Sequence, residues 1–424
     1  MKYKLILLTS FILFHLLSSQ VKLYAQSIRN CGTDRHLEYQ KKNIPGLKQK
    51  LIKQENNITK ATKSRNNFSK GKQIIYIPVV FHVIWSLNIH NISNAQINSQ
   101  IDILNQDYRR LNSDTSLTPN DFKAVAADVG IEFCLAHQDP DGNWTDGITR
   151  THSSKSVFEM NTDEAKFTST GGYDAWDATK YLNIWIVPSI SDNGMGGILG
   201  YTQWPGGSWT TDGVVIAYKY IGNIGTAVAP FNLGRTATHE IGHWLGLSHI
   251  WGDDNGACWG SDNIDDTPNQ AGSNYGCPTH PSISCSNNGD MFMNYMDYTD
   301  DTCMNIFTID QKIRMLTVLD SIRPIIKTSG KCQANSIESN KNIIDFSISP
   351  NPSSFMLLLS WKNQSLAKKI EIKIIDVYGR VVIELTKESN KLNTNIKINN
   401  LEPGLYLINL KSGSMLGTKK LIIQ

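Results

Sequence analysis

The segment from His239 to His249 constrains the fold more than any other part of the chain, because it reads His-Glu-Ile-Gly-His-Trp-Leu-Gly-Leu-Ser-His. His239 and His243 are four residues apart, so on a helix both side chains lie on one face and can reach the same metal ion. Gly246 permits a sharp turn that a side chain would obstruct, and the turn returns His249 as a third ligand. The segment therefore predicts a helix and a tight turn that together hold one metal ion.

The residue types of this segment indicate which metal and which chemistry to expect. Three neutral imidazoles suit zinc and leave a fourth position open to water, as in catalytic rather than structural zinc sites. Glu240 lies beside that position and is predicted to act as the general base. A chance match of five specified residues in eleven positions is expected in roughly one chain in several thousand, so three unrelated histidines on an exposed helix are a poor explanation.

The extended motif resembles that of the metzincin metallopeptidases, and a second segment, Asn-Tyr-Met-Asp-Tyr at residues 294–298, supports the resemblance. Metzincins place a methionine in a tight turn beneath the zinc ligands, and Met296 matches it. Tyr298 matches a tyrosine near the metal, whose phenol would hydrogen-bond the oxyanion formed during attack. Without the family, Met296 would be ordinary core and Tyr298 a plain aromatic residue.

The form of the zinc motif and the cysteine-rich stretch after it resemble the pappalysin branch, in particular its bacterial and archaeal members, over about residues 70–325. The resemblance implies an α+β metzincin domain, with a mixed twisted sheet and a zinc-binding helix. Similarity to calcium-bearing relatives also points to a calcium site at Asp262, Asp266 and the Thr267 carbonyl. Carboxylates in a Gly/Asn-rich loop suit this hard cation, although a solvated acidic loop is the alternative.

The chain has seven cysteines, four of them after the zinc motif. The resemblance implies the disulfides Cys258–Cys285 and Cys277–Cys303. From sequence alone, the other two pairings of these four cysteines are equally open. Cys134 and Cys332 can pair with each other or stay free, and their spacing and that of the other cysteines fits no zinc ribbon.

The N-terminus is typical of a secretory signal peptide over residues 1–25. Lys2 and Lys4 precede an apolar stretch from Leu5 to Leu17, and Ala25-Gln26 offers a cleavage point. A membrane anchor is the alternative, for which the stretch is short, and no later apolar run is long enough to span a membrane. A net charge of +3 is too weak to indicate a nucleic-acid binder.

Residues 26–70 are predicted to be a propeptide. Arg29-Asn30-Cys31-Gly32 matches an Arg-x-Cys-Gly segment that several pappalysin-like enzymes carry in a propeptide, where the thiolate occupies the fourth zinc position. Thiolate is a strong zinc ligand, and an odd cysteine in a secreted chain needs an explanation. An incidental or disulfide-bonded cysteine is the alternative. Residues 33–72 are basic with little apolar periodicity, so we expect them to be flexible.

Residues 71–328 are predicted to form the metzincin domain. The apolar, β-rich run from Ile74 to Trp85 predicts a buried strand, in which His82 is a core histidine rather than a ligand. Gly196 to Pro205 resembles the edge strand that pairs with an extended substrate in metzincins, with an ordinary hairpin arm as the alternative. Further elements are expected at residues 93–110 (helix), 131–135 and 181–187 (strands) and 308–322 (helix with a Thr308/Gln311 capping box).

The last part of the chain has a different character. Residues 329–342 are a polar linker, and residues 343–424 carry about seven short alternating strands, which indicates an immunoglobulin-like β-sandwich. Segments such as Ser-Pro-Asn-Pro at 349–352 and Leu-Glu-Pro-Gly-Leu-Tyr at 401–406 resemble the C-terminal sorting domain of type IX secretion. This implies a Bacteroidetes-type bacterium and a secreted or surface-held protein that interacts with that secretion machinery. A carbohydrate-binding sandwich is the alternative.

Together these features predict a secreted, zymogenic zinc endopeptidase that acts on proteins or peptides. The rival is a metzincin-like adhesin that has lost activity, against which a complete set of ligands and base argues. Some relatives prefer a basic residue just after the scissile bond, using an acidic pocket floor behind the last cysteine. Here Met304 follows Cys303, so this preference is not predicted, although Asp300 and Asp301 lie nearby in the sequence.

Overall fold

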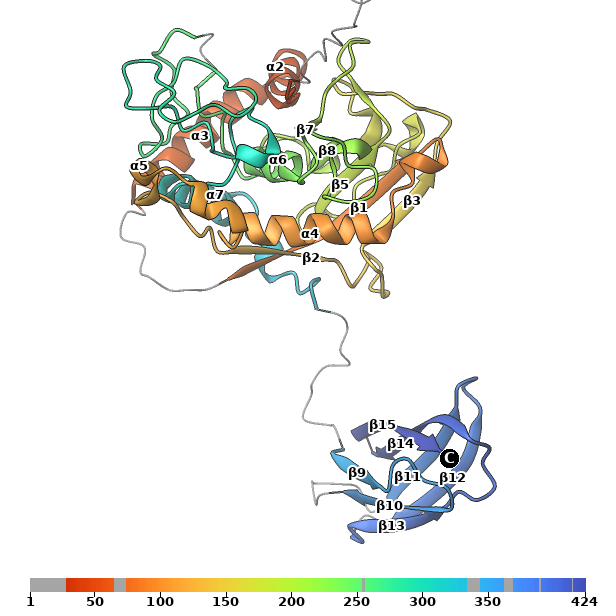
Figure 1. Cartoon of the computed structure of the whole chain (residues 1–424). Coiled ribbons are helices and arrows are strands. Elements are labelled where there is room, and N and C mark those ends of the chain that lie inside the picture. Colours follow the sequence, from red (N-terminus) through yellow and green to blue (C-terminus); the bar gives the residue numbers. More distant parts are fainter. Residues whose placement is uncertain are drawn as a thin grey trace, which may run out of the picture. The chain divides into compact units, whose positions relative to one another are not determined.

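The computed structural model describes residues 28–64, 74–253, 256–333, 344–361, 369–388, 390–413 and 415–424. The signal peptide expected at residues 1–25 lies outside these residues. The chain divides into two compact units, Met1–Ala334 and Asn335–Gln424 (Figure 1). In the described part of the chain, every helix is too short or too polar to cross a bilayer.

The first unit is built on a mixed sheet with the strand order β2-β1-β5-β8-β7, in which β3 also pairs with β1. All neighbours are parallel except β7, which runs antiparallel to β8 and forms an edge. The strands are β1 Ile75–Trp85, β2 Ile131–Leu135, β3 Ile148–His152, β5 Leu182–Val187, β7 Gly200–Thr202 and β8 Val214–Ala217, beside a separate pair, β4 Phe158–Glu159 and β6 Ile190–Ser191.

The apolar run that predicted β1 is buried on both faces of the sheet, as expected of a central parallel strand. His82 within it is a buried core residue, as predicted. Its ring nitrogens lie 2.9 Å from the Thr149 hydroxyl and 3.0 Å from the Asn183 side-chain oxygen. Both polar atoms of this histidine are therefore satisfied inside the core.

Three helices contribute apolar side chains to one core with the sheet, among them Leu104, Ile241 and Met315. The Thr308/Gln311 capping box is present at the start of α7, as predicted. The helices of this part are α4 Asn94–Tyr108, α5 Asn120–Lys123, α6 Arg235–Trp244 and α7 Ile309–Ser321. The core thus fixes α6, which carries the first two predicted metal ligands, against β7 and β8.

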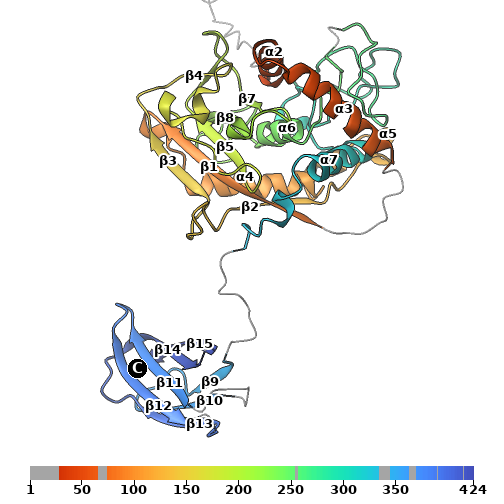
Figure 2. The same cartoon turned by 180° about the vertical axis from the view of Figure 1, so that it is seen from behind.

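The expectation of a flexible segment after Cys31 is wrong for residues 33–64, which form α2 Thr33–Asn43 and α3 Leu47–Ser64. Leu47, Leu51 and Ile58 are buried along α3. Their spacing places them on one helical face, and three apolar residues are enough to dock an otherwise polar helix. α3 packs against α7, and α2 lies beside β7 (Figure 2).

The second unit is all β, as predicted. One sheet has the order β13-β10-β9 and the other β12-β11-β14-β15. Alternate residues of both sheets, such as Leu359 and Ile372, enter one apolar core, which defines a sandwich. The strands are β9 Phe346–Ser349, β10 Met356–Trp361, β11 Lys369–Asp376, β12 Val381–Glu388, β13 Asn393–Lys397, β14 Gly404–Ser412 and β15 Met415–Ile423.

Candidate active site

The three predicted metal ligands converge at the end of α6. His239 and His243 lie one helical turn apart, and Gly246, with a φ of 85°, turns the chain so that His249 returns beside them. The Nε2 atom of His243 is 3.1 Å from the Nε2 atoms of both His239 and His249. These distances bring three imidazole lone pairs to one point, as a tetrahedral zinc site requires.

Backbone carbonyls fix the orientation of two of these rings. The Nδ1 atom of His239 lies 2.7 Å from the Tyr295 carbonyl, and that of His243 lies 2.7 Å from the Leu247 carbonyl. A proton held at Nδ1 leaves Nε2 free to coordinate a metal. Burial lowers the pKa of His243 to about 3, so this ring stays in the neutral, ligating form. The donor set therefore fits zinc.

The third ring has carboxylate partners instead. The Nδ1 atom of His249 lies 2.6 Å from Asp34 Oδ2 and 3.1 Å from Asp253 Oδ1. A carboxylate behind a metal-bound imidazole raises its basicity and holds its orientation. Asp34 comes from α2 and was not singled out by the sequence, since nothing local links it to His249.

Cys31 completes the cluster from the N-terminal segment, residues 28–64. Its Sγ and one nitrogen from each of the three histidines all lie within 4.8 Å of one another. Burial, with the Glu240 carboxylate nearby, raises the pKa of the Cys31 thiol to about 12. A cation at the histidines would reverse this shift and hold the sulfur as a thiolate.

Glu240 is buried beside the same point. Its Oε2 atom accepts hydrogen bonds from the Thr33 hydroxyl at 2.8 Å and the Cys31 thiol at 3.5 Å. Burial raises its pKa to about 7. A Cβ atom added to Gly200 of β7 would lie 3.0 Å from Glu240 Cγ, so a glycine there lets the edge strand pass close to the carboxylate.

Met296 packs against Gly242 of α6, and Tyr298 lies against the histidine rings. Met296 is fully buried, and a Cβ atom added to Gly242 would lie only 2.4 Å from its sulfur. The ring of Tyr298 is centred 4.9 Å from that of His249. Burial raises the pKa of this phenol well above 10, which keeps its hydrogen-bond donor. The zinc motif allows any residue at position 242, but the contact with Met296 requires a glycine there. The sequence alone does not reveal this contact.

The structure shows a buried pocket that holds a cationic side chain, which the sequence did not predict. The Arg29 guanidinium is buried and donates to Asp301 Oδ1 at 2.5 Å, to the Thr299 carbonyl and to the Thr236 hydroxyl. It also lies 4.8 Å from the centre of the Phe231 ring. Asp301, two residues before the last cysteine of the zinc region, is therefore the acidic group of this pocket.

The two carboxylates of the predicted calcium site each accept a hydrogen bond within the protein. Asp262 Oδ2 accepts from the Thr267 hydroxyl at 2.9 Å, whereas Asp266 Oδ2 accepts from the Asp310 backbone at 3.0 Å. These carboxylates therefore have separate partners.

The structure contains three disulfides. Two are the pairings that the resemblance implied, Cys258–Cys285 and Cys277–Cys303. The third, Cys134–Cys332, joins the end of β2 to the chain after α7 across 198 residues of sequence. Cys31 is the cysteine left without a disulfide partner in the described residues. A disulfide-bonded Cys31, the alternative in the sequence, is absent from the structure.

Comparison with known proteins identifies the family. A profile described as "Pregnancy-associated plasma protein-A" matches residues 168–320. An extracellular metalloprotease of Pyricularia oryzae is 35% identical over 241 residues, which are 55% of this chain and 69% of that protein. The chain belongs to this family, the pappalysins. A second extracellular metalloprotease, from Sordaria macrospora, is 30% identical to this pappalysin over 311 residues, which are 69% of this chain and 89% of that protein.

Solved structures agree. Mature mirolysin of Tannerella forsythia with a cleaved peptide is 50% identical to this pappalysin, with a TM-score of 0.58 over 62% of this chain and 97% of that one. A promirolysin mutant from the same organism is 46% identical, with a TM-score of 0.63 over 72% of this chain and 98% of that one. The metzincin fold and the metalloendopeptidase class predicted from the sequence are thereby confirmed.

The second unit has its own match. A profile described as "Secretion system C-terminal sorting domain" covers residues 347–424 of this pappalysin. This confirms the predicted sorting domain and, with the extracellular relatives, the secreted or cell-surface location.

Proposed function

We propose that this protein is a latent zinc endopeptidase, and the convergence of His239, His243 and His249 beside Glu240 carries the proposal. The three Nε2 atoms would hold the metal. When bound, zinc supplies a Lewis acid that polarises a peptide carbonyl and makes water a better nucleophile. The boundaries we propose are a propeptide at 26–70, a catalytic domain at 71–328, a linker at 329–342 and a sorting domain at 343–424.

The chain's own residues would move the protons. Glu240 accepts a proton from the attacking water and passes it to the leaving amine, a role that its burial and raised pKa suit. The Tyr298 phenol, protonated and next to His249, donates a hydrogen bond to the oxyanion. β7 supplies a sheet edge on which a peptide can extend past these groups.

Latency is proposed to come from the N-terminal segment. Its backbone already pairs with β7: Gly32 donates to the Gly200 carbonyl at 2.9 Å, and Leu199 donates to the Asn30 carbonyl at 2.9 Å. Cys31 then lies at the histidines and hydrogen-bonds Glu240. The segment would therefore block substrate, water and base together.

Specificity for a basic side chain is proposed from the Arg29 pocket. A buried guanidinium in contact with a carboxylate and over an aromatic ring shows what chemistry the pocket accommodates. Once the segment leaves, the same pocket would accept an arginine of the substrate just after the scissile bond, the position at which some pappalysin relatives prefer a basic residue.

A calcium site at Asp262, Asp266 and Thr267 stays a proposal. Asp262 is buried, and burial raises its pKa to about 7. A cation bound there would stabilise the ionised carboxylate. Lower thermal stability in a chelator that spares zinc would support the site, and an unchanged melting temperature would count against it.

One experiment tests the proposed function. The protein freed of residues up to the end of the propeptide is incubated with a proteome-derived peptide library, with and without a zinc chelator, and its N-terminus is sequenced. Chelator-sensitive cutting before arginine is expected. Absence of cutting by the folded, zinc-loaded protein would favour the adhesin instead.

A further inference from the structure

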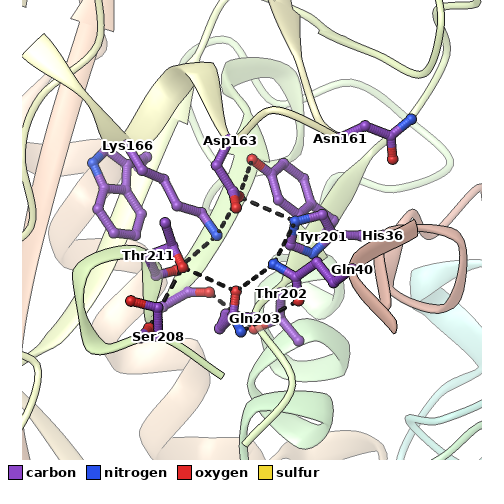
Figure 3. A network of polar contacts seen from close by, with 12 residues as sticks. His36, Gln40, Asn161, Asp163, Lys166, Tyr201, Thr202, Gln203, Ser208 and Thr211 are labelled. Atoms are coloured by element: carbon purple, nitrogen blue, oxygen red, sulfur yellow. Dashed lines mark hydrogen bonds and ion pairs between the residues drawn. The ribbon is translucent and has the colours of Figure 1, made fainter. Parts of the chain in front are cut away.

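A second buried contact between the N-terminal segment and the rest of the first unit lies beyond Cys31 along the chain (Figure 3). His36 of α2 is completely buried, and its Nε2 atom is 3.2 Å from Asp163 Oδ1. Its ring packs edge-on against Tyr201 of β7, with 4.9 Å between the ring centres. His36 therefore fills a pocket next to the same edge strand that Cys31 pairs with.

The pocket is built by residues that stay when the segment leaves. Asp163 Oδ1 also accepts hydrogen bonds from Lys166 Nζ at 2.8 Å and from the Tyr201 hydroxyl at 3.2 Å. Lys166 is completely buried and donates to the Thr211 carbonyl at 2.8 Å. The Asp163 charge is thus already paired inside the protein.

A neighbouring amide shares this arrangement. Gln40, one helical turn after His36, donates to Gln203 Oε1 at 2.9 Å, and Gln203 is buried. Removal of the segment takes a donor away from both Asp163 and Gln203. Asp163 keeps Lys166 and Tyr201 as donors, and Gln203 Oε1 keeps the Thr211 hydroxyl at 3.1 Å. Each buried oxygen is then one hydrogen bond short, so the emptied pocket would favour a ligand that restores that bond.

The position of the pocket relates it to substrate. Along the N-terminal segment, Arg29 fills the Asp301 pocket, Cys31 lies at the histidines and His36 follows on the other side. If the Asp301 pocket holds the residue after the scissile bond, then the Asp163 pocket lies on the side of the residues before it. A substrate extended on β7 passes Tyr201, whose side chain forms one wall.

We propose that the pocket of Asp163, Tyr201 and Gln203 is a substrate subsite for a side chain before the scissile bond, and that it selects a neutral hydrogen-bond donor, histidine first. This inference rests on the proposed peptidase function. A lysine or arginine would meet the Lys166 ammonium at the same carboxylate oxygen. An apolar side chain would not replace the hydrogen bond that Asp163 loses with His36. An imidazole would replace it and would also pack against the Tyr201 ring, as His36 does.

The histidine in the zymogen supports this choice of ligand. His36 Nδ1 is buried and has no hydrogen-bond partner. The pocket therefore holds the ring through its Nε2 atom and through apolar packing such as the contact with Tyr201. A single donor is therefore enough to replace His36 at Asp163. Side-chain amides meet the same requirement without the ring contact and would rank second.

The test uses the mature enzyme and fluorogenic peptides that share an arginine after the scissile bond. Each of the four positions before it is varied among histidine, leucine and lysine, at a pH where imidazole is neutral. At one position, kcat/KM for histidine is expected to be about three- to tenfold higher than for leucine or lysine, the effect of one hydrogen bond. A library in which no position prefers histidine would overturn the proposal.

Variants link that preference to the pocket. Asp163→Asn with Lys166→Met removes both charges together, and asparagine suits the left-handed backbone of Asp163 (φ 53°). The histidine preference should disappear while the arginine preference stays. Asp192→Asn is the matched control, because Asp192 contacts Arg35 of the same helix outside the pocket. If the double variant does not fold, Tyr201→Phe, which removes one hydroxyl, should weaken the preference.

The outcomes separate the two claims. A histidine preference that survives both the double variant and Tyr201→Phe would overturn the subsite. Loss of all peptide cutting by the wild-type protein would instead contradict the proposed function.

Discussion

Glu240 is the residue on which the proposed chemistry depends most directly. Its carboxylate is buried beside the three histidines but is not one of the converging ligands. Glu240→Ala should therefore lower kcat by roughly 10²- to 10⁴-fold, the usual contribution of a general base, while zinc stays bound. Metal analysis and peptide hydrolysis check both parts. Glu132→Ala, which removes a remote carboxylate paired with Arg109, is the control; hydrolysis retained by Glu240→Ala would overturn the mechanism.

Gly242 gives an independent test of the packing beneath the metal. An alanine normally stabilises a helix relative to glycine, by about 1 kcal/mol. Here the added Cβ would lie 2.4 Å from the Met296 sulfur. Gly242→Ala should instead destabilise the fold by about 1–3 kcal/mol and weaken zinc binding, measured by thermal unfolding and metal titration. Gly272→Ala, where a Cβ meets nothing within 4 Å, is the control. Equal stability of the two variants would contradict this account.

The proposed preference for a basic side chain depends on Asp301. Its Oδ1 atom meets Arg29, while Oδ2 accepts the backbone N–H groups of Leu233 and Arg235. Asp301→Asn in the mature enzyme should lower kcat/KM for arginine-containing peptides by about 10- to 100-fold, with a smaller effect on neutral ones. Thermal unfolding shows whether the backbone contacts survive. Asp300→Asn should leave the arginine preference in place, and an equal loss in both variants would refute the role of Asp301.

Two of the contacts that dock the N-terminal segment are expected to control latency. Cys31 lies at the histidines and His36 lies in the Asp163 pocket. Cys31→Ala should activate the precursor early, and His36→Ala should also shorten the lag before activity, because it removes the second contact. Activity of the purified precursor over time measures both. Lys53→Ala, on the exposed face of α3, should keep wild-type latency. A Cys31→Ala precursor as latent as wild type would contradict the model of latency.

Arg314 shows how α3 is held at a distance from the metal. It donates to Glu55 of α3 at 2.8 Å and to the Gly246 carbonyl at the turn of the zinc motif. The Glu55 carboxylate therefore neutralises the buried Arg314 guanidinium, which also hydrogen-bonds the turn of the zinc motif. Arg314 thus connects the docked N-terminal segment with the turn that positions His249.

The two units of the protein have separate cores and separate tasks. No buried residue is shared between the core of the sandwich and that of the first unit in the described residues. Removal of residues 335–424 should therefore leave the melting temperature and, after activation, the peptide hydrolysis of the remainder unchanged, while the protein accumulates inside the cell envelope. Fractionation and activity assays test this. The full chain with the same tag is the control, and normal export of the truncated chain would exclude the sorting role.

Several parts of the fold could be predicted because their signals are local. Segments of about ten residues were enough to predict three features. These are the apolar strand β1, the capping box of α7 and the alternating C-terminal strands. α2 and α3 could not be predicted in this way. Their composition is polar, and the three apolar residues of α3 are buried only because α3 packs against α7.

The cluster of His239, His243 and His249 follows from local sequence, because helical spacing and one turn glycine bring the three residues together without help from distant ones. The residues that surround this cluster are brought there by long-range packing. Cys31 meets Glu240 across 209 residues of sequence, and Arg29 meets Asp301 across 272. Such contacts depend on how whole elements pack, and neither periodicity nor composition encodes which distant side chains will share one buried pocket.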